Sequence, residues 1–275
     1  MELTIIDPNI FTIPAFELFS MTIGPISLKW YGLMYLLGLI SAWLLAHHRA
    51  KKSANWTPEE ISDVIFYAFL GIVIGGRVGY VIFYQFERFL SEPMYLLKIT
   101  EGGMSFHGGF LGVLLAFLYF GRKANKTFFE ISDFFAPFVP IGLGLGRIGN
   151  FINGELYGRI ADASLPWAMR FPTDPDYLLR HPSQLYQAFL EGLLLFILLM
   201  WFSAKPRPRM AVSGLFALGY GCFRFLVEFY RQPDAQLGLL QLNLSMGQWL
   251  SMPMIILGVF LLYLAYKNAP ATKHK

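Results

Sequence analysis

An arginine and two carboxamides directly follow a strongly apolar run, in residues 146–159 (GRIGNFINGELYGR). Arg147, Asn150 and Gly154 stand at positions i, i+3 and i+7, so on a helix they would share one face. A guanidinium presents a fork of hydrogen-bond donors that matches a phosphate, and the glycines let a ligand come close. This spacing predicts a phosphate-binding face at the end of the apolar run.

A second charged cluster lies later in the chain. Arg224, Glu228 and Arg231 stand at i, i+4 and i+7, and Tyr220 lies one turn earlier, so a helix would present all four on one face. Two interpretations are open. The cluster is either an ion-pair network at a helix end or a positively charged face for a phosphodiester, with Glu228 orienting an arginine and Arg147 completing a two-sided clamp.

His107 stands between two glycine pairs, in residues 102–109 (GGMSFHGG). It is either a turn histidine at a membrane surface or a proton acceptor, since flanking glycines admit a substrate and an imidazole titrates near neutral pH. Tyr31 is either an interfacial aromatic anchor or part of the site. Glu155 is expected to fix Arg147 or Arg159.

Composition favours a bundle of helices in lipid. The 275 residues are 55% apolar and 15% charged, whereas an average soluble domain has about 25% charged residues. An arginine at membrane depth suggests a functional site, and carboxamides there, such as Asn150 and Asn153, must find partners. The single cysteine, Cys222, allows no internal disulfide.

The predicted fold is an all-α polytopic membrane protein with about seven transmembrane helices and a small irregular extracytoplasmic head. Thr57 and Glu60 form a capping box around Pro58, so a helix should start there, and Pro137 and Pro140 should break another helix. Glycines 71, 75 and 79 should form a groove for a second helix. The expected spans are residues 29–46, 57–84, 105–121, 128–148, 182–202, 212–230 and 246–266.

The basic residues predict the orientation of this single integral membrane domain, residues 1–275. Four clusters of Lys and Arg at alternate ends place residues 47–57, 122–127, 203–211 and 267–275 in the cytoplasm. Residues 1–27, 86–104 and 155–182 would then be extracytoplasmic arms and head, with the N-terminus outside and the C-terminus inside. We find no nucleotide phosphate loop, no HExxH and no GxSxG, and we expect no metal, no cofactor and no nucleic-acid partner.

Residues 146–158 fit the pattern G-R-x-G-N-F-x-N-x-E-x-x-G, and the chain thereby resembles the prolipoprotein diacylglyceryl transferases. The resemblance extends to residues 29–32 (KWYG), 102–109, 181–186 (HPSQLY) and 224–231 (RFLVEFYR). Two positions depart from the family pattern. Lys29 stands where a histidine often precedes Trp-Tyr-Gly, and Tyr157 stands where a tryptophan is common.

The resemblance implies an enzyme of the bacterial inner membrane. It would transfer the diacylglyceryl group of phosphatidylglycerol to the lipobox cysteine of a preprolipoprotein signal peptide, forming a thioether and releasing glycerol 1-phosphate. The expected catalytic residues are His107, Arg147 and Arg224. The expected substrate-binding residues are Tyr31, Asn150, Asn153, Glu155, Gly158, Tyr220, Glu228 and Arg231.

Two other classes of protein stay open on the residues alone. A transporter for an anionic solute could use the same arginines, although such proteins usually carry repeated halves and the Gly-Arg-x-Gly-Asn block occurs once. A membrane scaffold without catalysis would leave the clustered arginines unexplained.

Overall fold

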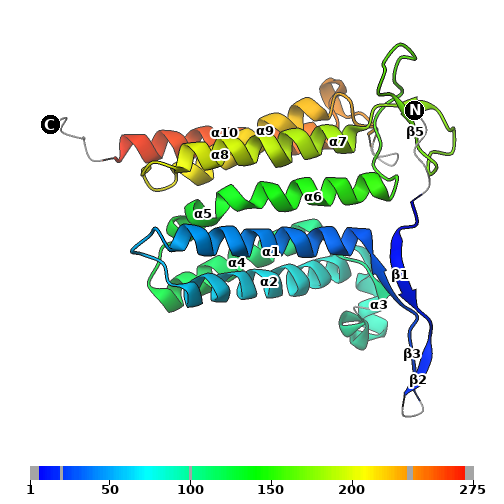
Figure 1. The fold of residues 1–275 in the computed structure, drawn as a ribbon, viewed down its shortest axis with the longest axis horizontal. Coiled ribbons are helices and arrows are strands. Elements are labelled where there is room, and N and C mark those ends of the chain that lie inside the picture. Colours follow the sequence, from blue (N-terminus) through cyan, green and yellow to red (C-terminus); the bar gives the residue numbers. More distant parts are fainter. Residues whose placement is uncertain (1–5, 19–20, 99–100, 234–237, 270–275) are drawn as a thin grey trace. The chain divides into compact units, whose positions relative to one another are not determined.

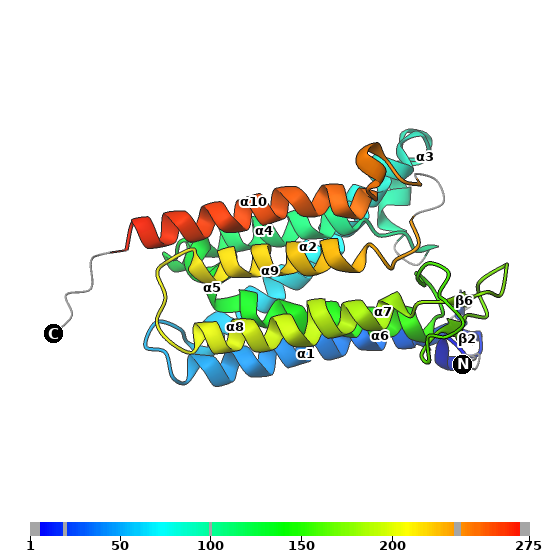
Figure 2. The ribbon, with the colours of Figure 1, turned by 90° about the horizontal axis from the view of Figure 1, so that it is seen from above.

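The computed structural model describes residues 6–18, 21–98, 101–233 and 238–269. The chain divides into two compact units, one of Met1–Ala42 with Phe135–Lys275 and the other of Trp43–Phe134. Figures 1 and 2 give the elements of each unit. Helix α1 (Trp30–Ala50) contributes to both units.

Short strands precede α1. β1 (Asn9–Ile13) pairs antiparallel with β4 (Ile26–Lys29), and β2 (Phe16–Leu18) pairs antiparallel with β3 (Met21–Ile23). The segment before α1, which we expected to be an extracytoplasmic arm, thus contains short strands in its described part.

Helices α2 (Pro58–Tyr84) and α4 (Phe106–Ala124) form the centre of the second unit, where they lie side by side (Figure 1). The predicted capping box is present, since Glu60 N donates to Thr57 Oγ1 and Thr57 N donates to Glu60 Oε2. The predicted glycine groove is also confirmed. A Cβ on Gly75 would lie 2.3 Å from the carbonyl oxygen of Gly108, so any side chain would push the helices apart.

Arg77 fixes the connection between these two helices. This connection contains α3 (Phe86–Ser91) and the 3-10 helix η1 (Pro93–Leu97). The side chain of Arg77 is buried and donates to the carbonyl oxygens of Tyr95 at 2.6 Å, Leu96 at 3.1 Å and Lys98 at 2.9 Å. A buried guanidinium needs such acceptors, so Arg77 holds the segment that leads to α4.

The predicted break at the two prolines is confirmed. α5 (Phe128–Phe135) is followed by the 3-10 turn η3 (Ala136–Phe138) and then by α6 (Val139–Ile152). The loops beyond α6 include β5 (Met169–Arg170), which pairs with β6 (Leu179–Arg180). The described chain between α6 and β5 is irregular, with turns and bends and no helix.

The first unit continues as one long interrupted helix and a hairpin of two helices. The interrupted helix comprises α7 (Ser183–Gln187), the π-helix η4 (Ala188–Leu194) and α8 (Leu195–Ser203). α9 (Ala211–Val227), the 3-10 turn η5 (Gln241–Asn243) and α10 (Met246–Lys267) follow, with α9 packed along α10 (Figure 2). A close glycine contact joins α6 to η4, since a Cβ on Gly144 would lie 3.0 Å from Gly192 Cα.

Five helical segments in the described part of the chain are long and apolar enough to span a membrane, which defines a polytopic membrane protein. They are Trp30–Ala50, Pro58–Tyr84, Phe128–Ile152, Ser183–Ser203 and Met246–Lys267. The other two predicted spans correspond to α4, which is not among these five, and to α9, which is shorter. Large apolar side chains on α10, such as Ile256 and Phe260, are exposed, as a lipid-facing helix requires.

Candidate active site

Arg147 and Arg224 come from different helices and flank the same carboxylate, that of Glu191. Arg147 Nε of α6 lies 3.8 Å from Glu191 Oε2, and Arg224 Nη1 of α9 lies 3.8 Å from Glu191 Oε1. The Glu191 side chain is fully buried in η4, whereas the two arginine side chains are 20% and 15% exposed. The structure therefore brings together the two arginines that we expected to act jointly.

Glu228 joins a third arginine, Arg231, to this group. Its Oε1 lies 2.7 Å from Arg224 Nη2 and 3.2 Å from Arg231 Nη1. Its Oε2 accepts a 2.6 Å hydrogen bond from Ser245 Oγ, at the N-cap of α10. We gave two interpretations of Arg224, Glu228 and Arg231, and the first of them, an ion-pair network at the end of α9, is present in the structure. The cluster nevertheless keeps one positive charge in excess, because three guanidiniums meet two carboxylates.

Gly158 holds the segment that follows α6 against the end of α9. It forms an antiparallel bridge with Arg231, and a Cβ on it would lie 2.5 Å from the carbonyl oxygens of both His181 and Tyr230. Arg159 Nε adds a hydrogen bond of 3.1 Å to Arg231 O. No residue larger than glycine fits at 158 without displacing backbone, so this position sets the distance between two segments of the site.

Glu155 binds carboxamides instead of the arginines that we expected. Its Oε1 accepts hydrogen bonds from Asn150 Nδ2 at 2.8 Å and from Asn153 Nδ2 at 3.2 Å. The expected contact with Arg159 is wrong, since that guanidinium donates to backbone carbonyls. The local reason is that α6 ends at Ile152, and the chain turns back at Gly154, whose φ is +68°.

This turn also corrects the expected helix face. Gly154 lies beyond α6 and does not share a helical surface with Arg147 and Asn150. A positive φ is readily adopted by glycine, so the chain reverses there and brings Glu155 back toward the end of α6. The Nδ2 groups of Asn150 and Asn153 thus find an acceptor in Glu155, whereas Asn153 Oδ1 is buried without a hydrogen-bond partner in the described part of the chain.

Two tyrosines lie beside the cluster. Tyr31 of α1 packs on α6, because a Cβ on Gly149 would lie 3.0 Å from its ring, and its hydroxyl is 3.1 Å from that of Tyr35. Tyr220 stacks on Phe216 with ring centroids 6.0 Å apart and lies in the field of Glu191 and Arg224. Both predicted tyrosines are therefore in the first unit with the arginines.

His107 is the second residue of α4 and belongs to the other unit. Its side chain is exposed, and its ring contacts that of Phe106 edge-on at 5.7 Å between centroids. The hydroxyl of Ser105 caps the helix by accepting from Gly108 N at 3.3 Å. Its role as a base stays a prediction.

Sequence reasoning missed Glu191 and the glutamines around it. Gln187 Nε2 donates to Glu191 Oε1 at 3.3 Å, and Gln184 Nε2 donates to Glu155 O at 2.7 Å. A signal was present, because Glu191 is the one carboxylate within the apolar residues 183–203. A lone charge in such a segment marks a functional position.

The loop before α7 is held by an ion pair. Arg180 binds Asp174 through two hydrogen bonds, Nε to Oδ2 at 2.7 Å and Nη2 to Oδ1 at 2.9 Å. This guanidinium holds the pKa of the Asp174 carboxyl below its usual value. Burial lowers the pKa of the neighbouring His181 imidazole, whose Nδ1 is 3.2 Å from the Tyr186 hydroxyl.

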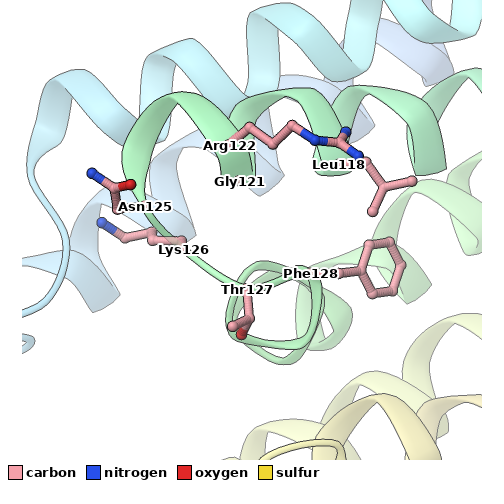
Figure 3. Close-up of a pocket in the computed structure, with 7 residues that line it drawn as sticks. All are labelled: Leu118, Gly121, Arg122, Asn125, Lys126, Thr127 and Phe128. Atoms are coloured by element: carbon pink, nitrogen blue, oxygen red, sulfur yellow. The ribbon is translucent and has the colours of Figure 1, made fainter.

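An open pocket of about 430 Å³ lies in the second unit, where α4 ends and α5 begins (Figure 3). Its basic residues are Arg122 and Lys126, and Lys126 already pairs with Glu60. None of the predicted site residues lines it. Within the described ranges, no three His, Cys, Asp or Glu side chains are grouped so that they could hold a metal ion.

The fold and the cluster define a polytopic membrane protein in which arginines and carboxylates of α6, η4 and the end of α9 meet. The family model for prolipoprotein diacylglyceryl transferase matches residues 18–264, and the chain belongs to this family. Relatives named phosphatidylglycerol–prolipoprotein diacylglyceryl transferase include one from Acinetobacter baylyi, 54% identical over 96% of this chain and 99% of its own length. Another, from Vibrio campbellii, is 59% identical over 90% of both chains.

Proposed function

We propose that this chain transfers the sn-1,2-diacylglyceryl group from phosphatidylglycerol to the lipobox cysteine of prolipoproteins, the first step of lipoprotein maturation. The thiol sulfur attacks the sn-3 carbon of the diacylglyceryl group and forms a thioether. The carbon–oxygen bond to phosphate breaks, and glycerol 1-phosphate leaves with that bonding pair. The observation that carries the proposal is the meeting of Arg147 and Arg224 on one buried carboxylate.

The arginines have donors to spare for a phosphate. Both contacts to Glu191 are 3.8 Å long, which exceeds the length of a hydrogen bond. Arg224 Nη1 is buried and has no hydrogen-bond partner among the described residues. The net charge of +1 matches a phosphodiester, and the donors strengthen as charge accumulates on the departing phosphate.

Glu228 and Ser245 position Arg224 in this arrangement. The carboxylate lies between Arg224 and Arg231 and is held by the N-cap hydroxyl of α10. Because Glu228 is buried and bonded on both oxygens, it fixes the Arg224 guanidinium before substrate binds. Tyr31, Asn150, Asn153, Glu155, Gly158 and Tyr220 complete the proposed substrate-binding set.

His107 is the proposed base for the substrate thiol. The thiolate is the competent nucleophile, and a neutral imidazole can take the proton near physiological pH. The attacking sulfur belongs to the substrate peptide, so the enzyme needs no nucleophile of its own. No metal or cofactor has a part in this scheme.

We further propose a single integral domain in the bacterial inner membrane with seven spans, α4 and α9 included. The basic clusters put the N-terminus, residues 86–104 and residues 155–182 outside and the C-terminus in the cytoplasm. The site then faces the side on which signal peptides emerge. Labelling single introduced cysteines from either side of the membrane tests this orientation.

The direct test mixes purified protein with phosphatidylglycerol and a lipobox peptide. We expect glycerol phosphate release and a matching gain in peptide mass. Arg147→Ala should abolish both products, whereas Arg122→Ala, which removes an exposed arginine of the other unit, should change neither. Solute flux through liposomes without lipid turnover would support a transporter and refute the transferase.

A further inference from the structure

Three side chains on the helix that carries Glu191 present hydrogen-bond acceptors without partners. Gln184, Gln187 and Glu191 are all fully buried and stand at i, i+3 and i+7, which places them along one side of the helix. Gln184 Oε1, Gln187 Oε1 and Glu191 Oε2 make no hydrogen bond within the described part of the chain. Buried polar atoms in proteins nearly always have partners, so three together are unusual.

The chemistry of their neighbours fixes which atom of each amide is unpaired. Gln184 donates to a backbone carbonyl, and Gln187 donates to a carboxylate. Both partners only accept, so the NH₂ group must face them and the oxygen must face away. The unpaired atoms are therefore acceptors, and what they lack is a donor.

These acceptors are close to the arginines through the Glu191 carboxylate. Glu191 Oε2 is the atom that lies 3.8 Å from Arg147 Nε, and Gln187 is bonded to the other oxygen of the same carboxylate. Glu191 also lies in η4, a π-helix. π-Helical segments are rare in proteins, and those that occur are often found at functional sites. The residue before Arg147 also has open space around it, because a Cβ on Gly146 meets no described atom within 4 Å.

The charge of the cluster restricts which headgroup can complete it. Three arginines and two glutamates leave +1, which one phosphodiester cancels. A neutral polyol beyond the phosphate keeps the site balanced, whereas an ammonium group would leave an uncompensated charge in a buried site. Hydroxyl groups are neutral donors, and the two of a glycerol headgroup can donate to two of the three acceptors, while Glu191 Oε2 also faces Arg147 Nε at 3.8 Å.

We propose that Gln184, Gln187 and Glu191 recognise the hydroxyls of the glycerol headgroup and so select phosphatidylglycerol among phospholipids. This inference rests on the proposed function, since it assigns the headgroup end of the same lipid site. The arginines bind the phosphate, and the acceptors of Gln184, Gln187 and Glu191 bind the glycerol that leaves with it. Specificity and phosphate binding thus lie on separate groups of side chains.

The test compares phosphatidylglycerol with phosphatidylpropanol, which keeps the phosphodiester and lacks both hydroxyls. We expect the wild-type protein to prefer phosphatidylglycerol by about tenfold or more in kcat/KM, because an unmatched buried acceptor is costly. Gln187→Met, of similar size, should lose most of this preference by losing activity on phosphatidylglycerol alone. Gln241→Leu, at an exposed glutamine, should keep the preference.

The outcomes separate this inference from the proposed function. Equal use of both lipids by the wild-type protein would overturn the inference and would leave the proposed transferase function standing. This comparison uses the wild-type protein alone. Transfer from neither lipid would refute the transferase itself. Equal losses on both lipids in Gln187→Met, with unchanged thermal unfolding, would make Gln187 a structural residue and overturn its role; if that variant does not fold, Gln187→Asn is measured in the same way.

Discussion

Arg224 and Arg231 offer a matched pair of substitutions, because both guanidiniums bind the same oxygen of Glu228. The distances to Oε1 are 2.7 Å and 3.2 Å. With an effective dielectric constant of about 20, Coulomb's law gives a gross attraction of about 6 and about 5 kcal/mol. Desolvation offsets part of this attraction, so removing one partner of a buried pair costs about 3–5 kcal/mol of unfolding free energy.

Arg224→Ala and Arg231→Ala should therefore destabilise the protein by similar amounts, at the lower end of that range. In each variant Glu228 keeps the other arginine and the hydrogen bond from Ser245. Their effects on activity should differ, because only Arg224 also flanks Glu191 opposite Arg147. We expect Arg224→Ala to lower kcat about 10²–10³-fold, as loss of a donor to developing charge does, and Arg231→Ala to lower it far less.

Glycerol phosphate release and thermal unfolding in the same lipid–detergent micelles measure the two effects. Arg224→Lys serves as a third variant, since it keeps the charge and loses the fork of donors, and it should recover part of the lost kcat. The reasoning is refuted if Arg231→Ala loses as much kcat as Arg224→Ala at equal stability. Full kcat in Arg224→Ala would refute it as well.

Three further predictions concern single positions. Gly158→Ala should cost about 3 kcal/mol or more of stability, because its Cβ would lie 2.5 Å from two carbonyl oxygens; Gly146→Ala, with open space around its Cβ, should not lower the unfolding temperature, and equal losses in both variants would contradict this. His107→Gln should lower kcat about 10²–10⁴-fold; turnover equal to that of the wild-type protein would exclude the base role. The Asp174 pKa is depressed by Arg180, so its contribution to stability is present above the unfolded pKa of about 3.9 and is lost as pH falls through the folded value. Asp174→Asn should therefore be less stable than wild type at pH 7 in thermal unfolding, and the difference should shrink in acid; a constant difference would argue against the ion pair.

Local signals in the sequence determined the ends and breaks of helices. The start of α2 is set by a signal four residues long, which contains Thr57, Pro58 and Glu60. The break between α5 and α6 is set by Pro137 and Pro140. The i, i+4 spacing likewise predicted the pairing of Arg224 with Glu228. These features depend on hydrogen bonds and contacts between near neighbours in the chain, which the residue types and their spacing specify directly.

The partners of the charged groups were decided by the tertiary structure. Glu191 lies 44 positions after Arg147 and 33 before Arg224, and only the packing of η4 against α6 and α9 puts it between them. Glu155 was assigned to an arginine, and the turn at Gly154 gave it to Asn150 and Asn153 instead. The sequence thus predicted a phosphate-binding set, and Arg147 and Arg224 lie on helices as expected, whereas α9 ends at Val227, before Arg231. Which of them meet depended on contacts between distant segments, because a side chain's partner is set by how helices pack and not by its neighbours in the chain.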